Sequence, residues 1–555
     1  MIYSFGLSLG ENPYQWDYST PDLFVALLSN PDTQFIHLIE LSPYDDTLPV
    51  TITTMPPMGT TAFGEFSITF GGGERKVYLS DLGFTTTPTD SEPNRHYKAL
   101  VDNPMEMDSS ILSGMDFGAG SISFGSIVIQ NGDGELDALS DYQWSGRSIT
   151  IKVGVQGLPY SQFKTVFSGA VADIETDDDE ITLTVRDNRI RTDQFINVAL
   201  YAGTGGLEGG ADLLGRPKPV CYGEVYNIEP VLVDAPNLVY QIHNGSIQDV
   251  PLVRDSGVPL TFGGDVADIT ASVPGAGQYL TQLSGGYIKL GSTPSGRVTA
   301  DAKGDNAGGY VSTVGGLVKR VAKTLPIRPF SSADIDDGAF ARIDAAVPGS
   351  MGFYLTEQTS ATEVIDGLLL PCLAYWNFTR TGALTGGAVS APSTPSASLT
   401  TDMIEENGLK RERTIPPAWR ISVGYAPLGI IQGEDELAGG TSASDRAFLT
   451  AGYRYVTYQD NDIRSKYDQA TDITFPTRLT NKADAQALLE RLKLILMVKR
   501  AVFTAPLLGN LYRRDIGETI NIQYPRYQLD AGVNLFVVGV GESANTGETV
   551  LGLWG

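Results

Sequence analysis

The segment 127–187 constrains the fold most strongly, because apolar and polar residues alternate there in one short run after another. The runs are IVIQNGDGELDAL, YQWSGRSITIKVGVQG and FSGAVADIETDDDEITLTVRD, and Asn-Gly, Asp-Gly or a cluster of acidic residues separates the apolar stretches. Alternation places every second side chain on one face of a strand, and these dipeptides favour tight turns. The segment therefore predicts short antiparallel strands joined as hairpins.

Similar strand patterns occur on both sides of this segment. FIHLIELSPY, VTITTMP, FGEFSITF and KVYLSDLGF precede it, while WRISVGYAPL, IGETINIQY and LFVVGVG lie near the end. Further hairpin turns are expected at Asn244-Gly245, Ser295-Gly296 and Thr381-Gly382, and the 62 glycines suit many such turns. We expect a mainly β fold with a few α-helices, divided into several domains because 555 residues exceed what one core can serve.

Three segments in the second half of the chain predict helices. The first spans 314–325, and the second spans 360–370, where TSATEV resembles a capping sequence and Pro371 follows. The third spans 482–498 and is expected to pack on the C-terminal strands through one apolar face. That face consists of Ala485, Leu488, Leu489, Leu492, Ile495 and Leu496. The stretch SAPSTPSASLTT, from Ser390, is expected to be a flexible connection.

Charge and cysteine content exclude several functional classes. The 65 acidic residues exceed the 39 basic ones and give a net charge of −26, which argues against a dedicated nucleic-acid-binding surface. Cys221 and Cys372 are far apart and predict two free buried thiols, so one chain cannot assemble a zinc module or an iron–sulfur cluster. No run of about 18 apolar residues is present, and the first residues do not look like a signal peptide. We therefore expect a protein made in a cytoplasm, without a membrane-spanning segment.

The order of several segments resembles the central-hub proteins of the tail tips and baseplates of long-tailed phages. In the first half, the matching segments are KVYLSDLGFTTTPTDSEPNRHY, the N-x-D-G and G-R patterns of the hairpin segment, and LGRPKPVCYGEVYNIEPVLVDAPNLVYQIHNGSI. In the second half they are residues 352–392 with YWNFTRTG, LKRERTIPPAWRISVGY, and the final helix followed by IGETINI, VVGVG and LGLWG. These segments cover about three quarters of the chain. Each segment alone is weak evidence, and the resemblance rests on the order in which the segments occur.

The resemblance implies a fold, an assembly and a set of partners. It implies two barrel-like β-domains with an inserted module, in a homo-oligomer that is usually a trimer around the tail axis. The regions are then an N-terminal β-rich region 1–105, a hairpin-rich domain 106–200, an inserted domain 201–312, an α/β region 313–400, and a C-terminal α+β domain 401–555 that completes a hub barrel. The implied partners are distal tail or tail-tube proteins, the tape-measure protein and receptor-binding or fibre proteins, at the distal end of the virion tail.

One turn carries oxygen-bearing side chains in a pattern that calcium-binding loops also use. Asn131, Asp133, Glu135 and Asp137 alternate, but the glycines stand at 132 and 134, whereas a calcium loop requires glycine at its sixth position and a bidentate carboxylate at its twelfth. A hairpin turn is the preferred interpretation, and a metal site is the alternative. Asp177, Asp178, Asp179 and Glu180 are expected to form a solvated turn.

Catalytic signatures are missing from the sequence. His37, His96 and His243 are the three histidines, and none lies in G-x-S-x-G or H-E-x-x-H; the phosphate-loop spacing is absent as well. We therefore expect no catalytic, cofactor-binding or metal-binding residues, no cofactor and no enzymatic activity. A pair of carboxylates that cleaves glycosidic bonds has no sequence signature, because the two acids meet only in the fold. A cell-wall-degrading or glycan-binding tail module is therefore the alternative to a structural hub.

Overall fold

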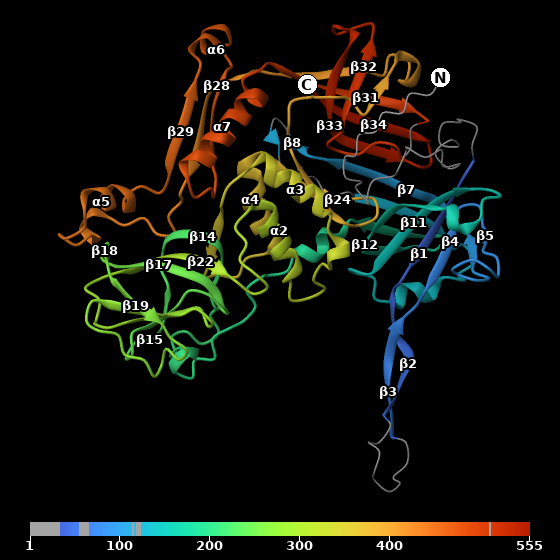
Figure 1. Ribbon diagram of the computed structural model, residues 1–555. Coiled ribbons are helices and arrows are strands. Elements are labelled where there is room, and N and C mark those ends of the chain that lie inside the picture. Colours follow the sequence, from blue (N-terminus) through green and yellow to red (C-terminus); the bar gives the residue numbers. More distant parts are fainter. Residues whose placement is uncertain (1–33, 55–65, 114–115, 118–123, 510–511) are drawn as a thin grey trace.

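The computed structural model describes residues 34–54, 66–113, 116–117, 124–509 and 512–555. It confirms the mainly β fold class, with several sheets and a smaller number of helices. Figure 1 shows an N-terminal β-unit on the right and a C-terminal β-unit above it. Helices in the centre connect these units to an inserted unit at the lower left. They also connect them to residues 418–496 at the upper left, which we call the blade.

The largest sheet has fifteen strands and spans both β-units in the order β27-β31-β34-β33-β7-β10-β13-β12-β11-β1-β4-β6-β5; in addition, β32 pairs with β33, and β26 pairs with β32. The N-terminal β-unit contributes β1 (Phe35–Leu41), β4 (Val77–Ser80), β5 (Phe84–Thr85), β6 (His96–Ala99), β7 (Val101–Ser110), β10 (Phe124–Gln130), β11 (Ser148–Val155), β12 (Lys164–Thr176) and β13 (Glu180–Arg186). The C-terminal β-unit contributes β26 (Ala397–Leu399), β27 (Lys410–Ile415), β31 (Arg500–Leu508), β32 (Thr519–Tyr524), β33 (Leu529–Ser543) and β34 (Glu548–Trp554).

The inserted unit consists of two five-stranded sheets packed around a shared apolar core. The first contains β14 (Val220–Ile228), β17 (Ile247–Asp255), β18 (Val258–Pro259), β22 (Val298–Asp305) and β23 (Gly352–Leu355). The second contains β15 (Val231–Asp234), β16 (Val239–Gln241), β19 (Thr261–Asp265), β20 (Gln278–Gln282) and β21 (Tyr287–Leu290). The described strands form open sheets, so the barrel-like shape that the resemblance implies is not seen as a closed barrel. The division into five regions stays a prediction.

The three predicted helices are confirmed as α2 (Val314–Lys323), α4 (Ala361–Leu369) and α7 (Lys482–Leu496). Each begins where a side-chain oxygen of Thr313, Ser360 or Asn481 accepts a hydrogen bond from a backbone N–H of the first turn. Sequence reasoning missed α3 (Asp337–Ala346), α5 (Ala443–Leu449) and α6 (Asn461–Lys466). Their apolar patterns are short, and α6 buries no residue at all.

The expected packing of α7 on the C-terminal strands is wrong. The helix lies over β28 (Ala418–Tyr425) and β29 (Arg454–Gln459), which form the blade sheet with β30 (Thr471–Pro476). Ile421, Val423 and Val456 of this sheet belong to the large core that contains the buried face of the helix, and the C-terminal strands join this core through other residues, among them Val502 and Trp554. The apolar stripe was identified correctly, but a stripe does not specify which sheet it covers.

Two predicted hairpin turns are confirmed and three are wrong. The acidic turn 177–180 joins β12 to β13, and Thr381-Gly382 joins β24 (Ala374–Phe378) to β25 (Leu384–Ala388). The Asn131-Gly132 stretch instead leads into a short 3₁₀ helix, and β10 pairs with β13 and β7. At Asn244-Gly245 and Ser295-Gly296 the flanking strands belong to different sheets. A turn dipeptide fixes only a local reversal, so it can equally pass the chain from one sheet to another.

Three further segments lie outside the elements given so far. The stretch from Ser390, expected to be a flexible connection, contains β26, which pairs in parallel with β32, so that expectation is wrong. The short strands β8 (Leu112–Ser113) and β9 (Asp116–Phe117) pair with each other. β2 (Tyr44–Thr54) and β3 (Phe66–Glu74) form a two-stranded arm that extends away from the N-terminal β-unit. Within the described ranges, no helix has the length and apolar character needed to cross a membrane.

Candidate functional site at the junction of the two β-units

The N- and C-terminal β-units meet where β7 pairs with β33. The ladder runs from Gly539 opposite Ser110 to Ser543 opposite Glu106. It is extended at both ends by backbone hydrogen bonds, from Ile111 N–H to the Val538 carbonyl (2.8 Å) and from Ala544 N–H to the Met105 carbonyl (2.9 Å). Segments more than 400 residues apart thus share one sheet, and buried charged and polar side chains gather at this junction.

Arg380 connects a third element to this junction. It lies at the tip of the β24–β25 hairpin, which projects from the helical layer. Its guanidinium donates to both carboxylate oxygens of Glu542, at 2.6 and 3.0 Å, and also to Asp515 (3.2 Å) and the Arg514 carbonyl (2.8 Å). The Glu542 side chain is almost fully buried, so this bidentate pair replaces the water that the carboxylate has lost.

Next to this pair lies a chain of three side chains, Asp81, His37 and Tyr512, of which His37 and Tyr512 are buried and Asp81 is partly exposed. His37 Nδ1 lies 2.7 Å from Asp81 Oδ2, and its Nε2 lies 3.0 Å from the Tyr512 hydroxyl. The backbone N–H of Tyr512 donates to Glu542 (2.8 Å), which joins the chain to the Arg380 pair. His37 belongs to β1, so this contact ties the N-terminal β-unit to the segment before β32.

An acid, a histidine and a hydroxyl in line have the order of a nucleophilic triad, but the surroundings do not suit catalysis. Tyr512 has no exposed surface, and burial raises the pKa of its phenol. A substrate therefore has no access to the hydroxyl, which also stays protonated. The arrangement can satisfy buried polar groups and hold the two β-units in register.

The β24–β25 hairpin is also fixed to the N-terminal β-unit. Asn188 Nδ2 donates to the Gly382 carbonyl (2.8 Å), and the Arg189 guanidinium lies 4.1 Å from the centre of the Trp376 ring. Trp376 in turn donates its indole N–H to Asp366 (2.6 Å), and burial raises the pKa of that carboxyl. Gly382 has a φ of +83°, a conformation that suits glycine and brings the turn close to Asn188.

A second polar cluster involves Glu40 of β1 and Lys152 of β11. The Glu40 carboxylate accepts hydrogen bonds from Lys152 Nζ, the Tyr97 hydroxyl and the Tyr160 hydroxyl, each at 2.8 Å. Burial alone would raise the pKa of Glu40, but the hydrogen bonds and the charge of Lys152 outweigh it and lower the pKa. The cluster therefore holds a charged carboxylate inside the N-terminal β-unit.

The Asn131 turn uses its side chains for its own hydrogen bonds. Asn131 Oδ1 accepts from Leu136 N–H (2.8 Å), Asn131 Nδ2 donates to Asp137 (2.8 Å), and Asp133 accepts from Glu135 N–H (3.0 Å). Glu135 pairs with Lys98. Across the described residues, no three His, Cys, Asp or Glu side chains gather in a group that could hold a metal ion.

The remaining histidines and cysteines lie apart from the junction. His243 accepts a hydrogen bond from Cys221 N–H (3.1 Å) and lies near Asp305 in the inserted unit, whereas His96 contacts Thr85 at the surface. Cys221 and Cys372 are free and fully buried, as predicted. Burial raises the pKa of Cys372 to about 12 and that of Cys221 further, so both thiols stay protonated and unreactive.

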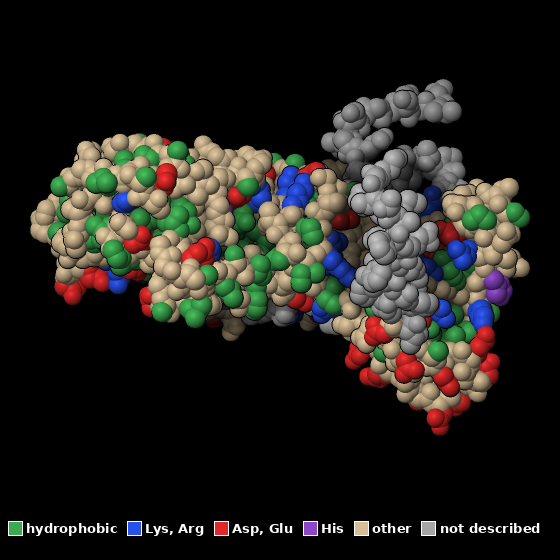
Figure 2. Space-filling model, turned by 90° about the horizontal axis from the view of Figure 1, so that it is seen from below, with side chains coloured by type: hydrophobic (Ala, Val, Ile, Leu, Met, Phe, Trp, Pro, Cys, Tyr) green, Lys and Arg blue, Asp and Glu red, His purple; other side chains and the backbone are tan. Residues whose placement is uncertain are grey.

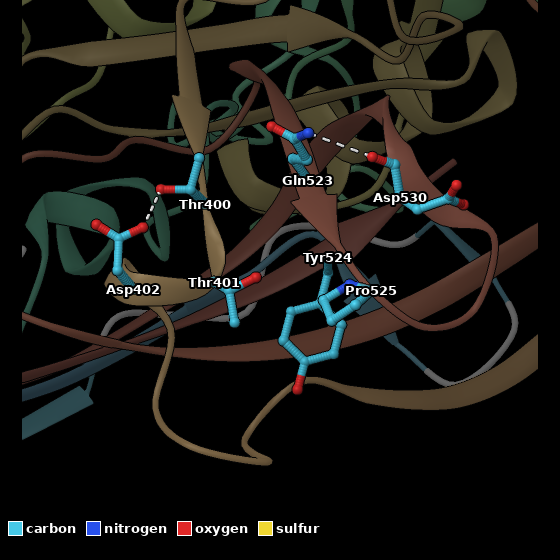
Figure 3. A pocket seen from close by; sticks show the side chains of 7 residues that line it. All are labelled: Thr400, Thr401, Asp402, Gln523, Tyr524, Pro525 and Asp530. Atoms are coloured by element: carbon cyan, nitrogen blue, oxygen red, sulfur yellow. Dashed lines mark hydrogen bonds between the residues drawn. The ribbon is translucent and has the colours of Figure 1, made fainter.

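Two open grooves lie on the surface of the described residues, away from the junction. One groove, of about 320 Å³, lies between the turn after β26 and the β32–β33 turn, and Figure 3 shows its seven lining side chains. Thr400 donates to Asp402 on one side of the groove, and Gln523 donates to the Asp530 carbonyl (3.3 Å) on the other side, so several polar groups are already bonded to neighbours on their own side. A second groove of about 430 Å³ lies between β27 and the segment after α6.

Comparison with known proteins gives distant likenesses only. No protein-family model and no curated protein matches the sequence. Among solved structures, the tail protein from Neisseria meningitidis MC58 is 11% identical, with 84% of this chain and 94% of that chain covered and a TM-score of 0.33. The 43 kDa tail protein of prophage MuSo2 from Shewanella oneidensis is 10% identical (83% and 95% covered, TM-score 0.30), and the prophage tail protein gp18 from Listeria monocytogenes EGD-e is 7% identical (83% and 91%, TM-score 0.32). At these scores the likeness assigns neither a family nor a function to this chain.

Proposed function

We propose that this chain is a structural protein of a phage tail tip or baseplate. It forms the central hub that closes the tail tube and connects it to receptor-binding or fibre proteins. The resemblance in the order of sequence segments supports this function. The structural observation that carries it is the junction, where β1, the β24–β25 hairpin and β33 are fastened together by buried charged and polar groups. A protein that transmits force between a tube and fibres needs such fixed geometry between its units.

The proposed assembly is a closed ring, most simply a trimer around the tail axis. Its partners are the distal tail or tail-tube proteins, the tape-measure protein and the receptor-binding or central fibre proteins. The protein is made and assembled in the host cytoplasm. In the finished virion it lies at the distal end of the tail. Immunogold labelling of purified particles with a Fab against this chain tests the location: gold should be confined to the tail end opposite the capsid. Gold on the capsid, or along the whole tail, would contradict the proposal.

We also propose that the chain makes and breaks no covalent bond, because its triad-like cluster is buried and its thiols are protonated. The competing function is a carboxylate-only glycosidase. Pure protein is incubated with bacterial peptidoglycan and with capsular polysaccharide, and released fragments are measured by mass spectrometry. No release is expected. Turnover that is lost on replacing one pair of acidic residues would establish the enzyme instead.

A further inference from the structure

The segment 193–200, which connects the N-terminal β-unit to the inserted unit, holds large apolar side chains in solvent. Phe195 is 45% exposed, Val198 51% and Leu200 47%, whereas Asn197 between them is only 2% exposed. Large apolar side chains exposed singly are ordinary, but several in one short segment mark an interaction surface. We call these three residues, together with Leu214 and Ile327, the apolar strap.

The backbone of the strap is fixed, so these side chains cannot turn inward. Ile196 N–H donates to the Thr359 carbonyl (3.1 Å), and Ile196 itself packs against the main core. Asn197 donates to the Glu357 carbonyl (2.6 Å) and accepts from Thr359 N–H (3.1 Å). Further along, the Ala199 carbonyl accepts from Lys218 N–H (2.8 Å). The segment therefore presents its apolar side chains from a rigid support, as an interface requires.

Leu214 and Ile327 extend the strap at its two ends. Ile327, 68% exposed, is tied to Gln194 by two hydrogen bonds, from Ile327 N–H to Oε1 (2.7 Å) and from Nε2 to the Ile327 carbonyl (2.6 Å). Leu214, 65% exposed, precedes Gly215, whose N–H donates to the Tyr201 carbonyl (3.0 Å). Figure 2 shows the molecule from below, with apolar side chains scattered over its left and middle parts and acidic ones concentrated on the lobe at the lower right.

Two exposed arginines flank the strap without a carboxylate partner among the described residues. Arg328 follows Ile327 and donates to the Gly146 carbonyl (2.7 Å), and Arg216 lies two residues after Leu214. The whole chain, by contrast, carries a net charge of −26. Two copies of such a chain repel each other over most of their surfaces. At the strap, contact with a second copy would bury apolar surface. It would also let the two arginines form ion pairs with carboxylates of that copy.

We propose that the apolar strap is the surface through which one copy of this chain contacts the next copy in the assembly. The contact is head-to-tail: the strap of one copy meets a different, carboxylate-bearing surface of its neighbour, so that repetition closes a ring. This inference rests on the proposed function, because it names the subunit contact of the proposed ring. The occupant is a second copy of this chain, since its acidic surface complements the two arginines.

The first test is photo-crosslinking in assembled tail particles. Val198 is replaced by the photoreactive amino acid benzoylphenylalanine, and the matched control carries the same replacement at Val273, which is 86% exposed in the inserted unit. After illumination, crosslinked peptides are identified by mass spectrometry. We expect the Val198 probe to form adducts with another copy of this chain, and the Val273 probe to form none with it. Adducts only to other tail proteins, or no adducts, would overturn the inference.

A second test uses association in solution. The double variant Val198→Asp and Leu200→Asp is compared with Val273→Asp by mass photometry over a range of concentrations. The strap variant should associate at least tenfold more weakly, and all proteins should keep the same thermal unfolding midpoint because the replaced side chains are exposed. Equal association of both variants would contradict the inference. Copy number separates the two ideas: several copies in the tail without strap adducts reject only the strap, whereas a single copy rejects the proposed ring as well.

Discussion

At the residue scale, the buried charges of this chain are held in complementary clusters. Arg380 with Glu542 and Arg254 with Asp301 each place a carboxylate against a cation inside the protein, and Glu40 with Lys152 forms a similar pair that is only partly buried. Such pairs add little net stability when compared with apolar residues, but removing one partner leaves an uncompensated charge. The pairs instead determine which secondary-structure elements pack against each other.

Replacing Arg380 by Met should therefore destabilise the protein strongly. Glu542 would remain buried without its cation, and we expect a loss of about 3–5 kcal/mol in the free energy of unfolding, measured by urea denaturation. Arg446→Met is the matched control, because its partner Glu434 is 68% exposed, and it should cost less than about 1 kcal/mol. Equal losses in the two variants would show that the junction does not depend on this pair.

The Glu40 cluster predicts a dependence on pH. Because the pKa of Glu40 is lowered in the folded state, its contribution is present above the ordinary pKa of 4.5 and is lost as the pH falls through the folded value. Lys152→Met should cost about 2 kcal/mol at pH 7, less than for a fully buried pair because both side chains keep some exposure to water. The cost should shrink when unfolding is measured at pH 3. A cost that is unchanged at pH 3 would rule out the charge of Glu40 as its cause.

The polar junction could not be predicted from the sequence. His37 stands 44 residues from Asp81 and 475 from Tyr512, so no spacing rule connects the three. The cysteines were predicted correctly because burial of an isolated thiol is a property of one residue.

At the scale of elements, local sequence patterns predicted where helices and turns lie. They did not predict which sheet a helix packs on or which strands pair. Helix α7 has a cap and a clear apolar stripe within 15 residues, so both its position and its buried face follow from the sequence. The sheet that it covers does not, because several sheets offer similar apolar faces. For the same reason, turn dipeptides located reversals of the chain without showing which strands pair.

Replacing Leu492 by Asp tests the buried face of α7. Leu492 has no exposed surface, so the variant would bury an unpaired charge and should lose several kcal/mol, about 4 or more, or fail to fold. Leu494→Asp, two positions away on the same helix but 68% exposed, should change stability by about 0.5 kcal/mol or less. Thermal unfolding of the two variants measures the contrast. A stable Leu492→Asp protein would contradict the packing of the helix on β28.

At the scale of the whole molecule, the sequence predicted the mainly β class and the presence of several units. It could not predict that one sheet joins the two ends of the chain, because the pairing of β7 with β33 depends on strands more than 400 residues apart. This non-local pairing holds the N- and C-terminal β-units as one framework, and the inserted unit and blade extend from it. Such a framework suits a subunit that has to keep its shape within an assembly.

The proposed hub at the end of the tail tube can be tested with a density map of the tail end from purified particles, calculated without imposed symmetry. We predict that copies of this chain form a closed ring, with three subunits around the tail axis, at the position where the tube ends. The fifteen-stranded sheet should be recognisable in each subunit. A tail end that holds a single copy of the chain, or a chain that lies away from the tube, would contradict the account.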